Sequence, residues 1–332
     1  MDAALEAVDG LPFDDFVDAC YRQIMLRDPD TVWSYDLQVD YGLESFEEWT
    51  DLSPEAFEET CRLDTELLNL LRTHDWAVLT PEQQLDYDVY EWFLEDRIRL
   101  HEFPYWNYVL GPSAYGAQNQ GLDLLAILPI ESVQDAEDYI TRLRGVSAWM
   151  DQLIGAFRTR EAVGIVPTQL AVDMILSELD DMLPQIPDTS LAGTLGAYVS
   201  FVTRVQRIDG LDGTTRRTLL ADARDAISTS LIPAYRYLGE YVSTLADYLL
   251  EATGRPEGLS GSLRYDSYPG QACAYDIGYL KLLELRQRAM DELGEAFDLK
   301  EFHRVILLNG AIPLAVLEGV VDDWLAEKTE TD

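Results

Sequence analysis

The residues that suit metal chemistry best in this chain are its histidines, which are few and far apart: His74, His101 and His303. Hydrolytic zinc sites use about three protein ligands and an open position for water, commonly with two histidines one helical turn apart. His101-Glu102 begins such a pair, but Tyr105 stands four residues after His101, and Pro104 interrupts the helix. The sequence therefore predicts no intrinsic catalytic zinc site.

Other catalytic arrangements also lack the residues that they require. A carboxylate-bridged di-iron bundle needs Glu-x-x-His pairs, but the residues three before the histidines are Leu71, Ile98 and Lys300. The sequence contains no Gly-x-Ser-x-Gly elbow, no phosphate-binding glycine loop and no dinucleotide fingerprint. We interpret acidic pairs such as Asp180-Asp181 as solvated helix faces, because 61 acidic residues make such pairs common.

A mixture of aromatic and amide side chains between residues 102 and 121 is the first candidate ligand site. Tyr108 stands among other aromatic residues, and Gln118 and Gln120 follow a short glycine-containing stretch. Aromatic faces with a few amides suit a cleft for a peptide or another small molecule. The same composition suits a loop buried between helices, and the sequence leaves both interpretations open.

The charge of the chain excludes several classes of partner. The 332 residues carry a formal net charge of -37, and only three of the 24 basic residues are lysines: Lys281, Lys300 and Lys328. Such a surface opposes binding to nucleic acid or to anionic membranes. It also repels itself in dilute buffer, and this repulsion is screened at molar salt. We therefore expect a halophilic protein that works in a salt-rich cytoplasm.

The N-terminus and the cysteines fit the same compartment. The segment MDAALEAVDG lacks the basic and apolar regions of a signal peptide, and no apolar run approaches the roughly 18 residues of a membrane span. Cys20, Cys61 and Cys273 are few, odd in number and widely spaced. We expect small core residues or free thiols rather than disulfides or a zinc site.

Helical periodicity dominates the sequence, and strand-like alternation is scarce. Explicit start signals include Ser53-Pro54-Glu55, the capping box from Thr80 to Gln83, and Asp298 three residues before Glu301. We predict about ten helices, near 12–28, 53–74, 80–101, 132–158, 167–183, 190–208, 214–250, 270–293, 298–308 and 313–327. Pro233 should kink or split the seventh. Three stretches resist helix formation: 29–50, 102–121 and 252–269.

The predicted fold is therefore all-α, a single elongated multi-helix domain over residues 1–332 with little or no β-strand. The 47% content of hydrophobic residues is enough for a sizeable core. Apolar residues on the long helices, among them Leu280, Leu283, Leu285 and Met290, are expected to be core residues. We also expect His303, which lies between Phe302 and Arg304, to pack in the core.

Several blocks occur in an order that resembles a known family. They are LRDPDTVWSYDL (26–37), TDLSPEAFEE (50–59), GLDLLAILPIESVQDAEDYITRL (121–143), LIPAYRYLGEYV (231–242), EGLSG (257–261) and the segment from Arg264 to Glu318. This order resembles the helical proteins grouped as the domain of unknown function 885 family, which are similar to zinc metallopeptidase-like hydrolases. In that family a His-Glu-x-x-Pro-Gly-His-His motif precedes the last block, and here the motif is absent. The resemblance implies a shortened, haloarchaeal-type member with a deletion junction near residues 261–264.

The resemblance also implies a second candidate site. Arg264, Tyr265, Gln271 and Tyr275 match the family block that follows the metal motif, and Tyr235 lies in an earlier shared block. In zinc hydrolases, tyrosine or arginine side chains outside the ligand set stabilise a developing oxyanion, so these residues are candidates for binding a carboxylate or peptide carbonyl. The alternative is a Pro-Gly turn capped by Arg264, with Tyr275 packed on the core.

Two functions follow from this comparison as expectations. The first is a binding or assembly protein without intrinsic catalysis and without a cofactor, which has a protein partner or self-associates and binds a peptide or another small molecule. The second is a hydrolase or peptidase whose zinc site is completed by another chain. A degenerate gene product with no selected activity is a third possibility.

The charge generates a first prediction. The free energy of unfolding should be larger in molar KCl than in dilute buffer, because salt screens the self-repulsion of the acidic surface. Urea denaturation followed by circular dichroism at several KCl concentrations measures this difference. Equal stability in both buffers would rule out adaptation to high salt.

Overall fold

The computed structural model describes residues 2–35, 37–42, 45, 47–104, 111, 116–182, 196–253 and 270–330. All regular secondary structure within these ranges is helical, which confirms the all-α prediction. The chain divides into two compact units. The terminal unit comprises Met1–Ala19, Leu63–Glu102 and Tyr268–Asp332, and the central unit comprises Cys20–Arg62 and Phe103–Ser267. Each unit is described by itself, and the single-domain description stays a prediction.

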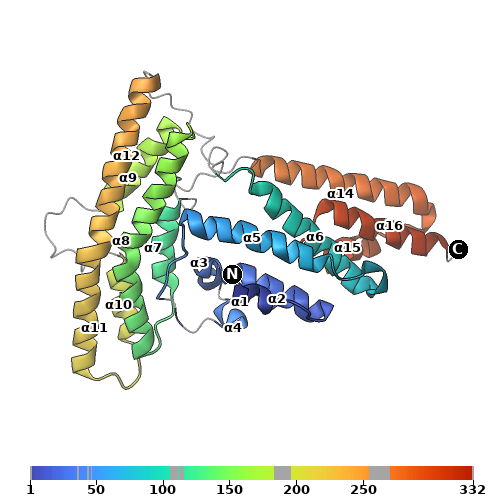
Figure 1. The fold of residues 1–332 in the computed structure, drawn as a ribbon. Coiled ribbons are helices and arrows are strands. Elements are labelled where there is room, and N and C mark those ends of the chain that lie inside the picture. The colour runs from blue at the N-terminus through green and yellow to red at the C-terminus, as the bar shows by residue number, and fades with distance from the viewer. Residues whose placement is uncertain are drawn as a thin grey trace. The chain divides into compact units, whose positions relative to one another are not determined.

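The helices fall into these units as follows (Figure 1). The central unit contains α3 (Pro29–Ser34), α4 (Gln38–Tyr41), α7 (Ala117–Ile127), α8 (Val133–Ala162), α9 (Gln169–Met182), α10 (Gly196–Val205), α11 (Gly213–Ala226) and α12 (Ile232–Thr253). The terminal unit contains α1 (Asp2–Glu6), a short 3-10 helix (Trp76–Val78), α6 (Pro81–Leu100), α14 (Gln271–Leu293), a second 3-10 turn (Gly294–Ala296), α15 (Leu299–Leu308) and α16 (Leu314–Glu330). The division falls within α2 (Phe13–Met25) and α5 (Pro54–Leu71).

Each of the ten predicted helices has a counterpart, and the cap signals explain where several of them begin. The hydroxyl of Thr80 accepts a hydrogen bond from the Gln83 amide, while the Gln83 side chain accepts one from the Thr80 amide. The Asp298 carboxylate accepts hydrogen bonds from the backbone amides of Lys300 and Glu301. Both arrangements satisfy amides that have no partner inside the helix.

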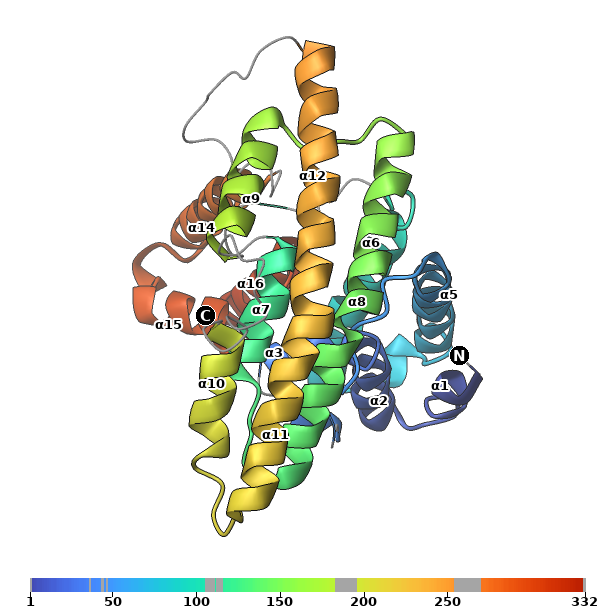
Figure 2. The same ribbon diagram turned by 90° about the vertical axis from the view of Figure 1, so that its left-hand side faces the viewer.

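The prediction that Pro233 kinks or splits the helix is borne out only as a change of hydrogen-bond pattern, because the helix continues through the proline. A π-helical segment, Ile227–Leu231, separates α11 from α12, and Pro233 is the second residue of α12. Proline has no backbone N–H and crowds the preceding turn, so the hydrogen-bond pattern changes there. Figure 2 shows that α11 and α12 nevertheless follow one another along nearly the same line.

Two predictions of non-helical structure were partly wrong. Within 29–50, Pro29–Ser34 forms α3, because Asp28 caps the helix and Pro29 occupies its first turn. Within 102–121, α7 begins at Ala117. Polar and aromatic residues obscured these short helices, which the rest of the central unit stabilises. The stretch 254–269 lies outside the described residues.

The 30-residue α8 lies at the centre of the central unit. Its buried side chains occur along its full length, from Tyr139 through Met150 to Phe157. The helix packs against α11, the π-helical segment and α12, while α12 also packs against α9 (Figure 2). The rings of Tyr139 and Phe201 stack with their centroids 4.9 Å apart. This unit therefore has one continuous apolar core.

The terminal unit has its own smaller core among α14, α15 and α16. It consists of Leu285, Ala289, Phe302, Leu317, Val321 and Leu325. Ion pairs supplement this packing: Glu318 of α16 lies 2.9 Å from Lys281 and 3.1 Å from Arg288 of α14. A third pair joins Lys328 of α16 to Glu301 of α15 at 2.8 Å. Two of the three lysines therefore hold helices of this unit together.

The core predictions for this region were only partly right. Leu285 is fully buried, but Leu280, Leu283 and Met290 are exposed. The buried positions of α14 recur at Leu285 and Ala289, a spacing that faces α15 and α16 and leaves the other side of the helix outside the core.

The prediction for His303 was wrong, because its side chain is exposed. Phe302 is the buried residue of α15, and Val305 and Ile306 pack partly against the same core. These three residues share one helical face, from which His303 is displaced by about 100°. His74, by contrast, packs against aromatic residues. Its ring centroid lies 5.5 Å from that of Phe13 and 4.8 Å from that of Phe16.

Candidate functional site

The predicted site residues lie in two separate groups. Gln118, Gln120 and Tyr235 belong to the central unit, whereas Gln271 and Tyr275 belong to α14 of the terminal unit. Three further predicted residues, Arg264, Tyr265 and Tyr108, lie outside the described residues.

The structure brings Gln118 and Tyr235 together in the interior of the central unit. The Tyr235 hydroxyl donates a hydrogen bond of 2.5 Å to the backbone carbonyl of Gln118. The Gln118 side-chain amide in turn donates a 2.6 Å bond to the Gly111 carbonyl. Burial raises the pKa of Tyr235, and the negative charge of Asp123 raises it further. The hydroxyl is therefore a hydrogen-bond donor and not a base.

Close packing fixes this arrangement. A Cβ atom on Gly116 would lie 2.2 Å from both the Gln118 side-chain oxygen and the Gly111 carbonyl, so only glycine fits. The neighbouring amides are used differently: Asn119 donates to Glu178 at 2.9 Å, and the Gln120 side chain is exposed. Of the two interpretations of this stretch, the geometry at Gln118 matches a buried structural contact.

The second predicted group contains one residue with a clear position. Tyr275 is 69% exposed on the first half of α14, so it does not pack on the core. Gln271 is the first residue of this helix, which follows Gly270 in a left-handed conformation at φ 86°. That conformation is favourable for glycine and explains why a Pro-Gly pair precedes the helix.

The exposed part of α14 is markedly apolar. Tyr275 and Tyr279 (63% exposed) lie one turn apart on one side of the helix, Leu280 (62%) lies beside Tyr279, and Ile277 (58%) lies on the opposite side from the tyrosines. Leu283 extends this set toward the second half of the helix. We call Tyr275, Tyr279, Leu280 and Leu283, which span roughly 140° of the helix, the α14 apolar face. Contiguous apolar groups of this kind on a surface commonly mark an interaction site.

A buried network near Arg142 was not among the predicted sites. The Arg142 side chain is fully buried, forms an ion pair with Asp30, and places its guanidinium carbon 4.1 Å from the centre of the Trp49 ring. The indole N–H of Trp49 donates a 2.9 Å hydrogen bond to the Arg142 carbonyl. Burial raises the pKa of Asp30 and the charge of Arg142 opposes that shift, while burial lowers the pKa of Arg142.

Residues of the blocks 26–37 and 50–59 surround this network. Asp28 accepts a 2.7 Å hydrogen bond from the Thr50 hydroxyl and a 3.1 Å bond from the Thr31 amide. The Thr50 amide donates to Asp30 at 3.2 Å. Both blocks were visible in the sequence, but their partner Arg142 is 112 residues away from Asp30. The Arg142 guanidinium contacts Asp30 and the Trp49 ring and therefore has a structural role.

A buried carboxylate with two basic partners lies in the terminal unit. Oδ2 of the fully buried Asp64 is 3.0 Å from Nε of Arg97 and 3.0 Å from Nε2 of His101. The histidine that began a zinc-like pair in the sequence is therefore held by an aspartate. Among the described residues, no group of three or more His, Cys, Asp or Glu side chains could hold a metal ion.

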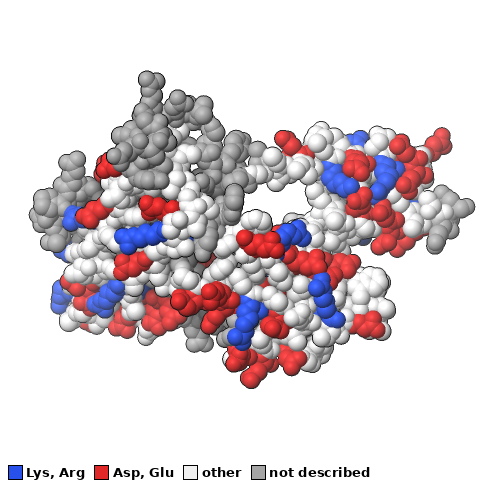
Figure 3. All heavy atoms as spheres, turned by 45° about the horizontal axis from the view of Figure 1, so that its top comes forward, with Lys and Arg blue, Asp and Glu red and all other residues white. Residues whose placement is uncertain are grey.

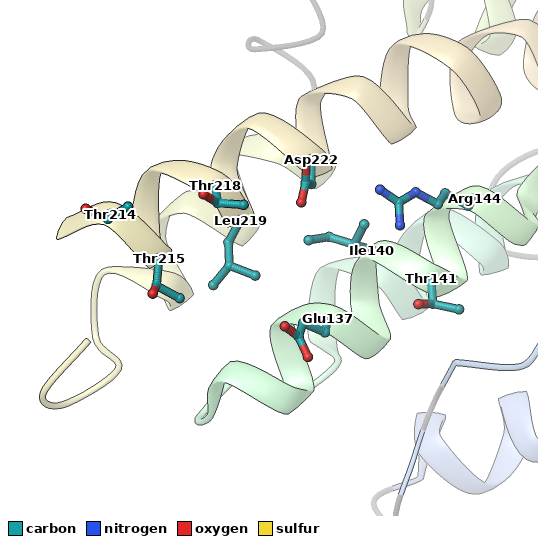
Figure 4. A pocket seen from close by; sticks show the side chains of 9 residues that line it. All are labelled: Glu137, Ile140, Thr141, Arg144, Thr214, Thr215, Thr218, Leu219 and Asp222. Carbon is teal, nitrogen blue, oxygen red and sulfur yellow. The ribbon is translucent and has the colours of Figure 1, made fainter. Parts of the chain in front are cut away.

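A groove of about 400 Å³ lies between α8 and α11 in the central unit (Figure 4). It is lined by Glu137, Ile140, Thr141, Arg144, Thr214, Thr215, Thr218, Leu219 and Asp222. Ile140 and Leu219 are buried and form its floor, while charged and hydroxyl groups surround them. No local sequence pattern indicates this groove, because its two sides are about 75 residues apart.

The surface and the helices add two general observations. Acidic side chains are spread over the face shown in Figure 3, with basic ones among them. In the described part of the chain, no helix is both long enough and apolar enough to cross a membrane.

Comparisons with known proteins identify the family. Residues 36–266 and 246–321 match the family described as "Bacterial protein of unknown function (DUF885)". The chain belongs to this family. No curated protein matches the chain.

A solved structure has the same fold. "The crystal structure of the putative lipoprotein from Colwellia psychrerythraea" matches with a TM-score of 0.72 at 14% sequence identity. The match covers 95% of this chain and 99% of that chain. At this identity the likeness shows the all-helical fold alone.

The network around Arg142 generates the second prediction. Asp30→Asn should lower the free energy of unfolding by about 3 kcal/mol, because it leaves a buried guanidinium without its counter-ion. Chemical denaturation at neutral pH measures the change. Asp151→Asn, an exposed change on the same helix as Arg142, is the control and should stay within about 0.5 kcal/mol. Equal effects of the two substitutions would contradict a structural role for the ion pair.

Proposed function

We propose that this protein is a binding or assembly protein without intrinsic catalysis, which associates with protein through the α14 apolar face. The observation that carries the proposal is the exposure of Tyr275, Tyr279 and Leu280 on one helix. Covering such side chains removes apolar area from water and gains roughly 25 cal/mol per Å². Aromatic residues are also enriched at protein interfaces.

The occupant that we propose is a second copy of this chain. An isologous dimer brings the same helical face of two copies together, and this is the commonest symmetric assembly. The net charge of -37 opposes self-association in dilute buffer but much less so at high salt. Assembly in a salt-rich cytoplasm is therefore consistent with the composition.

We also propose that this chain is a shortened relative of metallopeptidase-like hydrolases. The family matches this chain in two overlapping segments, 36–266 and 246–321, which supports a shortened pattern with a junction near residues 261–264. The structural match covers 99% of the Colwellia chain. This coverage supports the proposal that the shortened chain has a complete fold, which another protein of the same architecture also has. Within the proposal, the metal segment of the longer relatives is absent from this chain.

A third prediction tests the assembly. In molar KCl the wild-type chain should form a dimer, and Leu280→Glu should shift it to the 37.6 kDa monomer, because the new charge would be buried at the interface. Light scattering after gel filtration measures the mass. Val78→Glu is the matched control, since Val78 is also exposed in the terminal unit but lies outside α14. A monomeric wild-type chain, or equal effects of both substitutions, would overturn assembly through this face.

The alternative is a hydrolase whose zinc site is completed by another chain, and the same apolar face supports it because another polypeptide would cover that surface. The fourth prediction tests whether this chain holds a metal ion by itself. Elemental mass spectrometry of protein gel-filtered in molar KCl should find near-zero zinc, manganese and iron. About one tightly held metal ion per chain, or hydrolysis by the purified chain alone, would contradict a protein without intrinsic catalysis and would mean that this chain carries its own site.

A further inference from the structure

The groove between α8 and α11 is built from two rows with the same spacing. Glu137, Ile140, Thr141 and Arg144 occupy positions i, i+3, i+4 and i+7 of α8, and Thr215, Thr218, Leu219 and Asp222 occupy the same positions of α11. Residues at these positions share one face of a helix. Each helix therefore presents one continuous row to the groove, with an apolar residue between polar ends.

The charged groups of the groove are available for a ligand. The side chains of Glu137, Arg144 and Asp222 line the groove. Within the described part of the chain, none of them forms an ion pair or a side-chain hydrogen bond. In Figure 4 the guanidinium of Arg144 extends toward the side of the groove that carries Asp222. Several other arginines form ion pairs, for example Arg27 with Glu59 and Arg72 with Glu91.

The distribution of these groups selects one kind of molecule. Arg144 and Asp222 together offer a cation and an anion at one end, which suits an α-carboxylate and an α-ammonium group. Glu137 lies seven residues from Arg144, or roughly 10 Å along the helix, and offers a second anion. Between them the buried Ile140 and Leu219 provide an apolar floor for a methylene chain.

We propose that this groove binds a free basic amino acid of the lysine type. Its α-carboxylate contacts Arg144, its α-ammonium contacts Asp222, its methylene stem lies over Ile140 and Leu219, and its terminal ammonium contacts Glu137. The ligand's net charge of one positive unit matches the groove, which has two carboxylates and one guanidinium. Anionic ligands are disfavoured by the same count and by the charge of the whole chain.

Three probes separate the contacts. L-lysine carries all the groups, norleucine lacks the terminal ammonium, and cadaverine lacks the α-carboxylate. Isothermal titration calorimetry of the full chain at several KCl concentrations should detect L-lysine binding that weakens as salt rises, because these charges lie at the surface. Norleucine and cadaverine should each bind at least about tenfold more weakly than L-lysine, the usual effect of one lost charge-assisted hydrogen bond.

Matched variants assign each contact. Glu137→Gln should weaken L-lysine about tenfold and leave norleucine unchanged, whereas Arg144→Gln should weaken both and leave cadaverine unchanged. Asp151→Asn and Arg207→Gln, which alter exposed residues of the central unit outside the groove, should change nothing. All these side chains are exposed, and circular dichroism checks that each variant is folded.

Two results would overturn this inference. One is the absence of L-lysine binding at millimolar concentration and low salt in the folded wild-type chain. The other is L-lysine binding that Glu137→Gln and Arg144→Gln leave unchanged, which would place the ligand elsewhere. Neither result bears on assembly through α14, because the groove belongs to the central unit and the apolar face to the terminal unit.

Discussion

The burial of the Arg142 guanidinium sets a requirement that much of the central unit satisfies. A charge taken out of water destabilises the fold unless a counter-ion and further polar contacts surround it. Asp30 supplies the counter-ion, Thr50 and Asp28 hold the neighbouring backbone, and the Trp49 ring covers the guanidinium. These contacts join α3 and the segment before α5 to the first half of α8.

Small residues of α7 and α8 make this arrangement possible. The rings of Trp49 and Trp149 stack with their centroids 4.7 Å apart. A Cβ on Gly121 would lie 3.0 Å from Trp149, and one on Gly145 would lie 3.3 Å from Trp49. Both glycines therefore permit close approach of large aromatic side chains, and the packing that results keeps Arg142 away from water.

The two units use their polar groups differently. In the central unit, buried groups such as Gln118 and Tyr235 bond to each other, and charged side chains without an ion pair line the α8–α11 groove. In the terminal unit, the surface carries ion pairs between helices while an apolar face remains exposed on α14. The proposed ligand site and the proposed assembly site thus rest on opposite physical properties, unsatisfied charge in one unit and uncovered apolar area in the other.

The sequence by itself determined the helical class, the approximate positions of the ten predicted helices and the change of helical hydrogen bonding near Pro233, because caps, prolines and apolar periodicity act over a few residues. Only the tertiary structure decided which side of each helix faces a core: the apolar pattern of α14 includes both the buried Leu285 and the exposed Leu280. It also decided that Gln118 contacts Tyr235, that Asp30 pairs with Arg142, and that the rows of α8 and α11 form one groove. These contacts join residues far apart in the chain, and no local pattern specifies which distant surface a helix will meet.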